Sequence, residues 1–332
     1  MMTPIATIKF LVCLLLIGCS INSNEKPALT VYVSADEQIA REVFAVFTEK
    51  TGIEIEWVGD TESSKTTALV QRLIREKENP VADVFWSSEI LGTIQLAKEG
   101  VFASSNTNAC LSWSKQHRDS EYQWFAFSPR ARVIAYDPKK VQVDSLPKTW
   151  WEFGTASMAD PRFGTTGTHV AVMATAFPEE FANFLQEMEG TVLLGGNAAT
   201  VQSVIDGTAL FAMTDSDDVH AAIERGESIA MHYPTHTTGA GGGTLLIPNT
   251  VGVVRNCSNQ KLAETFVDFM LSDEVATILA SSASKNIPLQ HSVLVSFPEL
   301  VVENPLEVSF EAAAINREKA INRVMEARRN GD

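Results

Sequence analysis

The sequence is short of basic residues: Lys and Arg together number 26 against 41 Asp and Glu, a formal net charge of −15 over 332 residues. We therefore expect no nucleic-acid partner, because binding a phosphate backbone requires a basic face. The remaining composition, 45% hydrophobic and 20% charged, excludes a disordered chain and a multi-span membrane protein. Tyrosine is scarce as well, and none of the four residues adjoins another: Tyr32, Tyr122, Tyr136 and Tyr233.

Common catalytic motifs are also missing. The sequence contains no G-x-S-x-G, H-E-x-x-H or C-x-x-C pattern. Asp217 and Asp218 could in principle act as acid and base, but adjacent residues of a helix point about 100° apart. We expect a protein that is not an enzyme and needs no cofactor. An exported enzyme is the alternative from another class.

The N-terminus has the pattern of a processing signal. Lys9 precedes an apolar run, residues 10–17, that is too short to span a bilayer comfortably. The following Gly18-Cys19 completes a sequence that resembles a bacterial lipobox, in which the cysteine is acylated and becomes the new N-terminus. We predict a lipoprotein signal peptide over residues 1–18, lipidation of Cys19 and a tether over residues 19–28. The protein would be exported, lipid-anchored and periplasmic, or at the cell surface in a Gram-positive host.

Two further cysteines, Cys110 and Cys257, remain in the predicted mature chain. An exported protein can oxidise such a pair to a disulfide. Two separate buried thiols are equally compatible with the sequence.

Strands and helices alternate from residue 29. The patterns predict strands near residues 29–33, 53–58 and 81–86, with a helix after each, of which the first two are amphipathic. Such alternation is typical of parallel βαβ units, whose ligands bind where the strands end. The loops at residues 34–36 and 87–89 are therefore candidate binding loops. A strand over residues 124–136 is expected to be interrupted by Pro129.

Several phrases, in order along the mature chain, resemble type II periplasmic solute-binding proteins of ABC importers, specifically the ferric-ion-binding branch. They are FTEKTGI (47–53), PVADVF (80–85), RARVIAY (130–136), PNTV (248–251) and KLAETFVDFMLS (261–272). The resemblance implies an α/β fold of two lobes, each a mainly parallel sheet flanked by helices, joined by crossing strands. It also implies ligand capture in the cleft between the lobes and delivery to ABC permease and ATPase subunits, by a monomer.

The same resemblance suggests a division of the chain. Residues 29–126 form the first part of lobe one, residues 127–247 lobe two and residues 248–310 the return to lobe one, followed by a C-terminal helix over residues 311–332. We expect hinge motion about the crossing strands near residues 127–131 and 246–251.

The metal site of ferric-binding relatives is not reproduced. Those proteins place two adjacent tyrosines at the start of a helix in lobe two, where this sequence has Asp217 and Asp218. Asp36 stands where relatives can carry a histidine, and Ser88 stands at a glutamate position, with Glu89 next to it. A tyrosinate site for ferric iron is therefore not expected.

The residues that match the relatives' anion site are better preserved. Thr166, Gly167 and Thr168 open a helix, Asn197 precedes another, and Arg130 or Arg132 offers a forked donor. This combination predicts a small anionic solute, a phosphorylated sugar or a phosphonate. Carboxylates would accept hydrogen bonds from its hydroxyls or amine. The full set of predicted ligand-binding residues is Ser34, Asp36, Ser87, Ser88, Arg130, Arg132, Thr166, Gly167, Thr168, Asn197, Asp215, Asp217 and Asp218.

Three alternatives stay open. Asp36, Glu89, Asp217 and Asp218 could hold a ferric or other hard metal ion, or the acidic run could simply cap a helix. Trp86 could stack on a sugar or pack at a strand end. His232 and His236 flank Pro234, which excludes a helical metal chelate, so we interpret them as surface residues. Residues 239–243 are glycine-rich and predict a flexible turn.

Overall fold

The computed structural model describes residues 27–60, 66–152, 156–188, 191–237 and 239–331. The predicted signal peptide, Cys19 and most of the predicted tether lie outside these ranges. No helix within them is long and apolar enough to cross a bilayer.

Nine strands and twelve α-helices make up this part of the chain. The strands are β1 (Ala28–Val33), β2 (Glu54–Gly59), β3 (Val84–Ser87), β4 (Phe125–Tyr136), β5 (Ser157–Ala159), β6 (Val192–Leu194), β7 (Phe211–Asp215), β8 (Ala230–His232) and β9 (Leu246–Val253). The helices are α1 (Glu37–Thr51), α2 (Thr67–Glu76), α3 (Ile90–Lys98), α4 (Asn108–Ser112), α5 (Gly164–Ala176), α6 (Pro178–Gln186), α7 (Asn197–Ile205), α8 (Ser216–Glu224), α9 (Gln260–Met270), α10 (Asp273–Ser281), α11 (His291–Leu294) and α12 (Phe310–Gly331).

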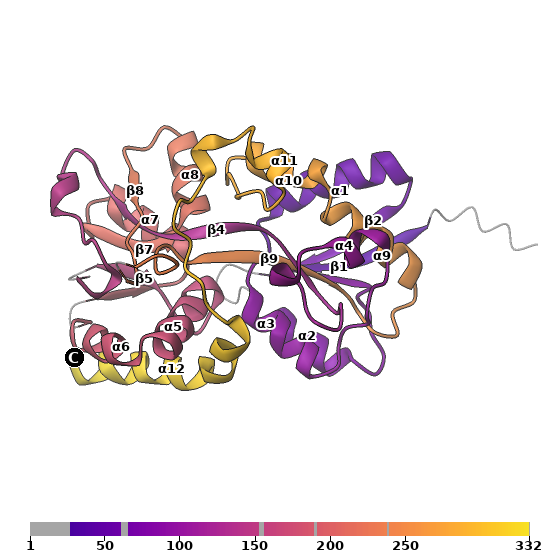
Figure 1. Ribbon diagram of the computed structural model, residues 1–332, viewed down its shortest axis with the longest axis horizontal. Helices are drawn as coiled ribbons and strands as arrows, with labels where there is room; N and C mark the ends of the chain where they lie inside the picture. Colours follow the sequence, from indigo (N-terminus) through magenta and orange to yellow (C-terminus); the bar gives the residue numbers. More distant parts are fainter. Residues whose placement is uncertain (1–26, 61–65, 153–155, 189–190, 238, 332) are drawn as a thin grey trace, which may run out of the picture.

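The strands follow the order β2-β1-β3-β9-β4-β7-β5-β6, with β8 also paired to β4. β1 is parallel to β2 and β3, and β5 is parallel to β6 and β7. β9 and β4 join these two sets and run antiparallel to their neighbours. Figure 1 shows β4 and β9 crossing the middle of the molecule between the two lobes. The predicted α/β class with two lobes and crossing strands is confirmed; the predicted boundaries at 127 and 248 fall inside β4 and β9.

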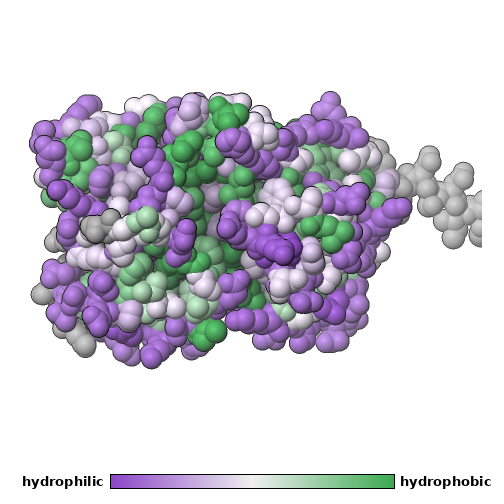
Figure 2. Space-filling model, in the orientation of Figure 1, coloured by the Kyte–Doolittle hydropathy of each residue, from purple (hydrophilic) through white to green (hydrophobic). Residues whose placement is uncertain are grey.

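Each lobe has its own apolar core. In lobe one, Phe47 of α1 packs edge-to-face on Phe266 of α9, with ring centroids 5.0 Å apart, over the buried β1 residue Val31. In lobe two, Met213 of β7 packs in one cluster with residues of α5, α6 and α12, such as Val324. On the face drawn in Figure 2, hydrophilic residues gather at the outer edges and hydrophobic residues run down the middle.

The strand expected to break at Pro129 is continuous over twelve residues, but it carries a bulge there. Ser128 takes a left-handed φ of 37°, and the register with β9 shifts between Phe127 and Arg130. Proline lacks an N–H for the ladder and is tolerated at a bulge. The Pro129 carbonyl still accepts a hydrogen bond from Ile287, at 2.8 Å. β4 therefore passes from one lobe to the other without ending.

Candidate binding cleft

A cavity of about 60 Å³ lies between the lobes, where strands end and helices begin. At roughly 15 Å³ per water molecule, it holds about four waters. Its lining comes from both lobes and from the crossing strands: Ala35, Asp36, Ile39, Trp86, Ser88, Arg130, Ala159, Asp160, Phe163, Gly164, Thr165, Thr166, Gly195, Gly196, Asn197, Asp215, Asp217, Asp218, Asn249, Leu279 and Asn286.

Four helices, α1, α5, α7 and α8, present their N-terminal ends to this cavity. In none of the four does the N-cap side chain accept a hydrogen bond from the N–H groups of the first turn. A helix N-terminus carries a partial positive charge and N–H groups without intrahelical partners. The cavity wall therefore offers positive dipole ends, which suit carboxylates of the protein or an anionic ligand.

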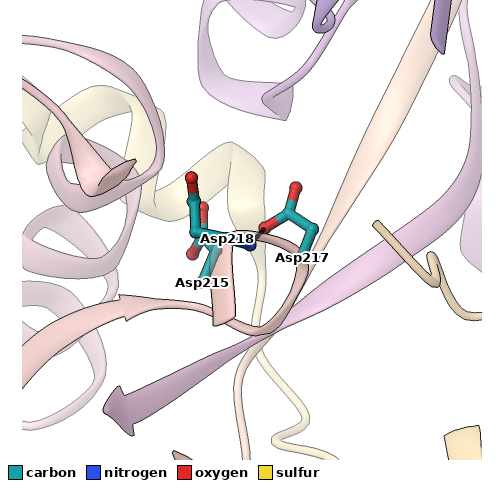
Figure 3. Close-up of side chains that lie close together, drawn as sticks. All are labelled: Asp215, Asp217 and Asp218. Atoms are coloured by element: carbon teal, nitrogen blue, oxygen red, sulfur yellow. Dashed lines mark hydrogen bonds between the residues drawn. The ribbon is translucent and has the colours of Figure 1, made fainter. Parts of the chain in front are cut away.

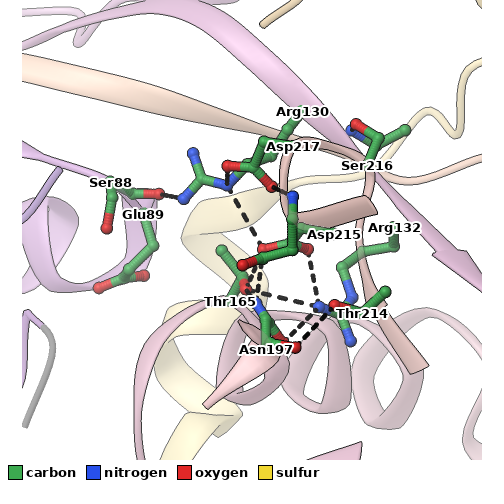
Figure 4. A network of polar contacts seen from close by, with 12 residues as sticks. Ser88, Glu89, Arg130, Arg132, Thr165, Asn197, Thr214, Asp215, Ser216 and Asp217 are labelled. Carbon is green, nitrogen blue, oxygen red and sulfur yellow. Dashed lines mark hydrogen bonds and ion pairs between the residues drawn. The ribbon is translucent and has the colours of Figure 1, made fainter. Parts of the chain in front are cut away.

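Asp215 is the centre of the polar network beside the cavity (Figure 4). It ends β7, is 1% exposed, and its Oδ2 accepts hydrogen bonds from Thr165 Oγ1 at 2.5 Å and Asn197 Nδ2 at 2.8 Å. Its Oδ1 pairs with Arg132 Nη1 at 2.7 Å. Burial alone would raise the pKa of Asp215, but Arg132 and Arg130 hold it below the ordinary value. The carboxylate is thus charged and largely occupied by protein donors.

Arg130 connects the two lobes across the cavity. Its Nε lies 3.3 Å from Asp217 Oδ2 and 3.4 Å from Asp215 Oδ2 in lobe two. Its Nη2 donates to the Ser88 carbonyl at the end of β3 in lobe one. The side chain is buried, which alone would lower its pKa, but Asp217 and Asp215 raise it instead.

Asp217 and Asp218 open α8 next to Asp215. Each of the three carboxylates can place one oxygen within 4.8 Å of the others. Figure 3 shows the three side chains gathered around the turn between β7 and α8. Asp217 and Asp218 are only partly buried, so solvent and a solute reach them. Hard cations are bound by such groups of carboxylate oxygens.

The charge balance of the cavity is acidic. Five carboxylates line it, from Asp36, Asp160, Asp215, Asp217 and Asp218, against the single guanidinium of Arg130. Counting also Arg132, paired with Asp215, and Arg162, paired with Asp160, leaves five negative charges against three positive. Within the part of the chain that the structure describes, these side chains give the cavity a net negative charge beside the positive ends of the four helices.

Of the nine predicted ligand residues other than the aspartates, four line the cavity and five do not. Ser88, Arg130, Thr166 and Asn197 line the cavity as expected. Arg132 does not line it. This side chain is fully buried behind Asp215, and its guanidinium also donates hydrogen bonds of 3.4 to 3.5 Å to Thr165, Thr166 and Asn197. A Cβ at Gly167 would collide with the Pro161 carbonyl, so this glycine serves packing inside the first turns of α5.

Three predicted residues are used by the protein itself. Ser34 accepts hydrogen bonds from Thr66 Oγ1 at 3.1 Å and from the Ser88 amide at 2.8 Å. Ser87 donates to the Glu89 carbonyl at 2.7 Å, and Thr168 donates to Glu89 Oε2 at 2.9 Å. None of the three lines the cavity.

The alternative in which Glu89 is a metal ligand does not fit this geometry. Glu89 is fully buried and caps α3, accepting from the Leu91 amide at 2.7 Å and the Gly92 amide at 2.8 Å. With Thr168 as a third donor, its carboxylate faces protein and not the cavity. The three-carboxylate group instead includes Asp215.

One other expectation is corrected, and one open alternative is decided. His236 is buried at 2% exposure, not on the surface, because Trp151 and Phe177 pack around it. Cys110 and Cys257 are free thiols. Burial raises the pKa of each to about 11, so both stay protonated and unreactive at neutral pH.

Trp86 packs at the end of its strand, which is one of the two roles left open for it. It is 1% exposed and packs edge-on against Phe44 in the core of lobe one, yet it also lines the cavity. Its Nε1 donates to Asn249 Oδ1 at 3.3 Å. Asn249 and Thr165 were missed in the sequence, and only Thr165 had a signal, its position next to the predicted hydroxyl run.

Comparisons with known proteins agree with the fold. Iron uptake protein A1 of Synechocystis sp. (strain ATCC 27184 / PCC 6803 / Kazusa) is 25% identical over 306 residues, covering 81% of this chain and 79% of that protein. Iron-bound HitA from Pseudomonas aeruginosa superimposes with a TM-score of 0.78 at 22% identity, over 91% of this chain and 99% of HitA.

A second structure, AfuA from Actinobacillus pleuropneumoniae with bound fructose-6-phosphate, gives a TM-score of 0.76 at 16% identity, over 92% of this chain and 99% of AfuA. Residues 23–277 match the family of bacterial extracellular solute-binding proteins, a range that takes in all the cavity-lining residues except Leu279 and Asn286. This chain therefore belongs to the bacterial extracellular solute-binding proteins.

Proposed function

We propose that this chain is the substrate-binding protein of an ABC importer and that its cargo is a hard cation of the ferric type. The observation that carries the proposal is the group of Asp215, Asp217 and Asp218, whose oxygens lie within 4.8 Å of one another in an acidic cavity. The names of similar proteins, an iron uptake protein and an iron-bound structure, support the same cargo.

The three carboxylates would have different roles in binding the cation. Asp217 and Asp218 are the partly exposed members and would supply ligand oxygens, together with Asp36, which also lines the cavity. Asp215 already accepts from Thr165, Asn197 and Arg132, so it would hold the turn in place. No tyrosine is among the cavity residues that the structure describes. A ferric complex would therefore lack the visible absorption that iron–phenolate bonds produce.

Export, lipidation of Cys19, delivery to a permease and ATPase, and a monomeric state belong to the same proposal. The family supports export and capture of a solute. Globomycin, which blocks cleavage of lipobox signals, should leave the precursor uncleaved, and Cys19→Ala should abolish incorporation of labelled palmitate. Palmitate labelling that survives Cys19→Ala would contradict the lipoprotein assignment.

A phosphorylated solute is the second candidate. The N-termini of α5 and α7 reach the cavity with Thr165, Thr166 and Asn197, which suits a phosphoryl group, and AfuA binds fructose-6-phosphate. Against it, Arg130 is already paired with two aspartates. The cavity would also have to open widely to admit a sugar phosphate.

Titration calorimetry distinguishes the two. We expect saturable, one-to-one binding of Fe³⁺ supplied as its nitrilotriacetate complex, and none of fructose 6-phosphate or inorganic phosphate. Asp217→Asn with Asp218→Asn should weaken iron binding at least a hundredfold. Asp144→Asn, at an exposed position away from the cleft, is the matched control and should change nothing. Binding of fructose 6-phosphate without iron would overturn the cation proposal in favour of the second candidate.

A further inference from the structure

Two histidines form a buried chain behind the cleft that the proposed cation binding does not use. His169 lies on α5 and His236 lies ahead of β9; they are 0% and 2% exposed. Arg132 Nε is 3.3 Å from His169 Nδ1, and the two histidine Nε2 atoms are 2.9 Å apart. His236 Nδ1 is 2.8 Å from the Gly243 carbonyl oxygen. An unbroken line of hydrogen bonds thus joins the partner of Asp215 to the glycine-rich turn.

The two ends of this line determine where its protons are. A carbonyl oxygen accepts only, so His236 Nδ1 carries a hydrogen and donates to Gly243. The Arg132 guanidinium donates only, so His169 Nδ1 is bare and accepts. In neutral rings the remaining nitrogens must be complementary: His169 Nε2 carries a hydrogen, and His236 Nε2 accepts it. This agrees with the 2.9 Å distance between them.

The surroundings keep both rings neutral and fixed. Burial lowers the pKa of His236 to about 4 and that of His169 well below its usual range. Trp150 packs edge-on to His169, with centroids 4.6 Å apart, and Phe177 stacks on His236 at 5.5 Å. A proton added anywhere in the chain would set two donors against each other.

The far end of the chain is anchored as well. The Gly241 amide donates to Asn304 Oδ1 at 2.9 Å, and the Thr244 amide donates to the Asn304 carbonyl at 2.9 Å. A Cβ at Gly243 would collide with the Asn304 backbone, so this turn packs closely on residue 304. The turn that accepts the hydrogen bond from His236 is thus held to residue 304 by two hydrogen bonds.

We propose that His236 is a positioning residue of the cargo site: through His169 it fixes the Arg132 guanidinium, which holds Asp215 and the turn that carries Asp217 and Asp218. The part that concerns cargo rests on the proposed function. Arg132 uses Nε for His169 and Nη1 for Asp215. A guanidinium is planar and rigid, so the acceptor at Nε sets the direction of the group at Nη1.

Two substitutions separate hydrogen bonding from packing. His236→Phe keeps an aromatic ring against Phe177 but removes both hydrogen bonds. His236→Gln can restore both, because its amide oxygen accepts and its amide nitrogen donates at a spacing close to that of the imidazole nitrogens. His232→Phe, four residues earlier on β8, is the matched control outside the chain.

The first measurement uses the ligand-free full chain with ¹⁵N-labelled histidine and arginine. Two-bond ¹H–¹⁵N correlations should show His169 as the Nε2–H tautomer and His236 as the Nδ1–H tautomer, both neutral at pH 7. The Arg132 Nε–H signal should be protected from exchange in the wild type and in His236→Gln, and lost in His236→Phe. The opposite tautomer at either histidine, or a protected Arg132 signal in His236→Phe, would overturn the proposal.

The second measurement is Fe³⁺ binding from nitrilotriacetate. Loss of a buried hydrogen-bond partner lowers the equilibrium constant for the arrangement that contains it by roughly fivefold to a hundredfold. We expect His236→Phe to bind about tenfold more weakly and His236→Gln and His232→Phe to bind within about twofold of the wild type. Wild-type affinity in His236→Phe would refute the positioning role. Absence of iron binding in the wild type would refute the proposed function alone, since the first measurement still decides on the chain.

Discussion

The buried pair of Arg132 and Asp215 is where a single substitution should have the largest effect. Arg132 is fully buried, Asp215 is 1% exposed, and their closest atoms are 2.7 Å apart. Arg132→Met removes the charge but retains a long apolar stem. Removing one partner of a buried pair typically costs about 3–5 kcal/mol, because the other charge stays buried without compensation. Arg130 remains 3.4 Å from Asp215, which places the expectation nearer 3 kcal/mol.

Urea denaturation followed by circular dichroism measures this loss. The double variant Arg132→Met with Asp215→Asn should recover part of it, because the uncompensated carboxylate is then absent. The pH dependence is a second check. In the wild type, the pKa of Asp215 is lower in the folded chain than in the unfolded chain. The ionised carboxylate therefore stabilises the fold at pH values above the ordinary aspartate pKa, and this contribution disappears as the pH falls through the folded-state pKa. A loss below about 1 kcal/mol in Arg132→Met would refute the central role of this pair.

Three further predictions concern other parts of the molecule. The pKa of His236 falls from 6.5 to about 4 on folding, so the unfolded chain binds a proton first as the pH falls. The free energy of unfolding should therefore drop by up to roughly 3 kcal/mol between pH 7.5 and 4. In His236→Gln the urea midpoint should depend less steeply on pH. Phe266→Ala, which removes the ring packed on Phe47, should destabilise by about 3–5 kcal/mol in the same assay, and a loss under 1 would contradict the packing described. Glu89→Gln should lower stability by about 1–2 kcal/mol through the cap of α3 and the Thr168 contact, yet leave iron affinity unchanged in calorimetry; a large loss of affinity would restore Glu89 as a ligand.

Much of the fold could be predicted because its determinants are local. The helix after β1 has its apolar residues at helical spacing and ends at Gly52, which adopts a left-handed φ of 71°. Asp217 and Asp218 follow a buried strand and open a helix, and such positions line clefts in α/β proteins. Sequence patterns of this kind predict local structure without information from distant segments.

What the sequence could not supply depends on contacts between distant segments. Arg130 and Arg132 lie two residues apart on one strand and share a face, so the sequence could not tell which one lines the cavity. In the structure, Arg132 forms a buried ion pair with Asp215, so Arg130 is the one that lines the cavity. His236 was expected at the surface because Pro234 is nearby, but Phe177, from a remote helix, covers it. Glu89 was similarly assigned from its neighbours, whereas Thr168 of the other lobe determines its surroundings.

The most direct test of the central claim is the identity of the native cargo. Protein purified from its own host without chelators should be examined by native mass spectrometry with elemental analysis of the same sample. The account predicts one equivalent of iron or another hard cation in the wild type, and none when Asp217 and Asp218 are both replaced by Asn. A phosphorylated organic solute at one equivalent, with no metal in the sample, would contradict the claim.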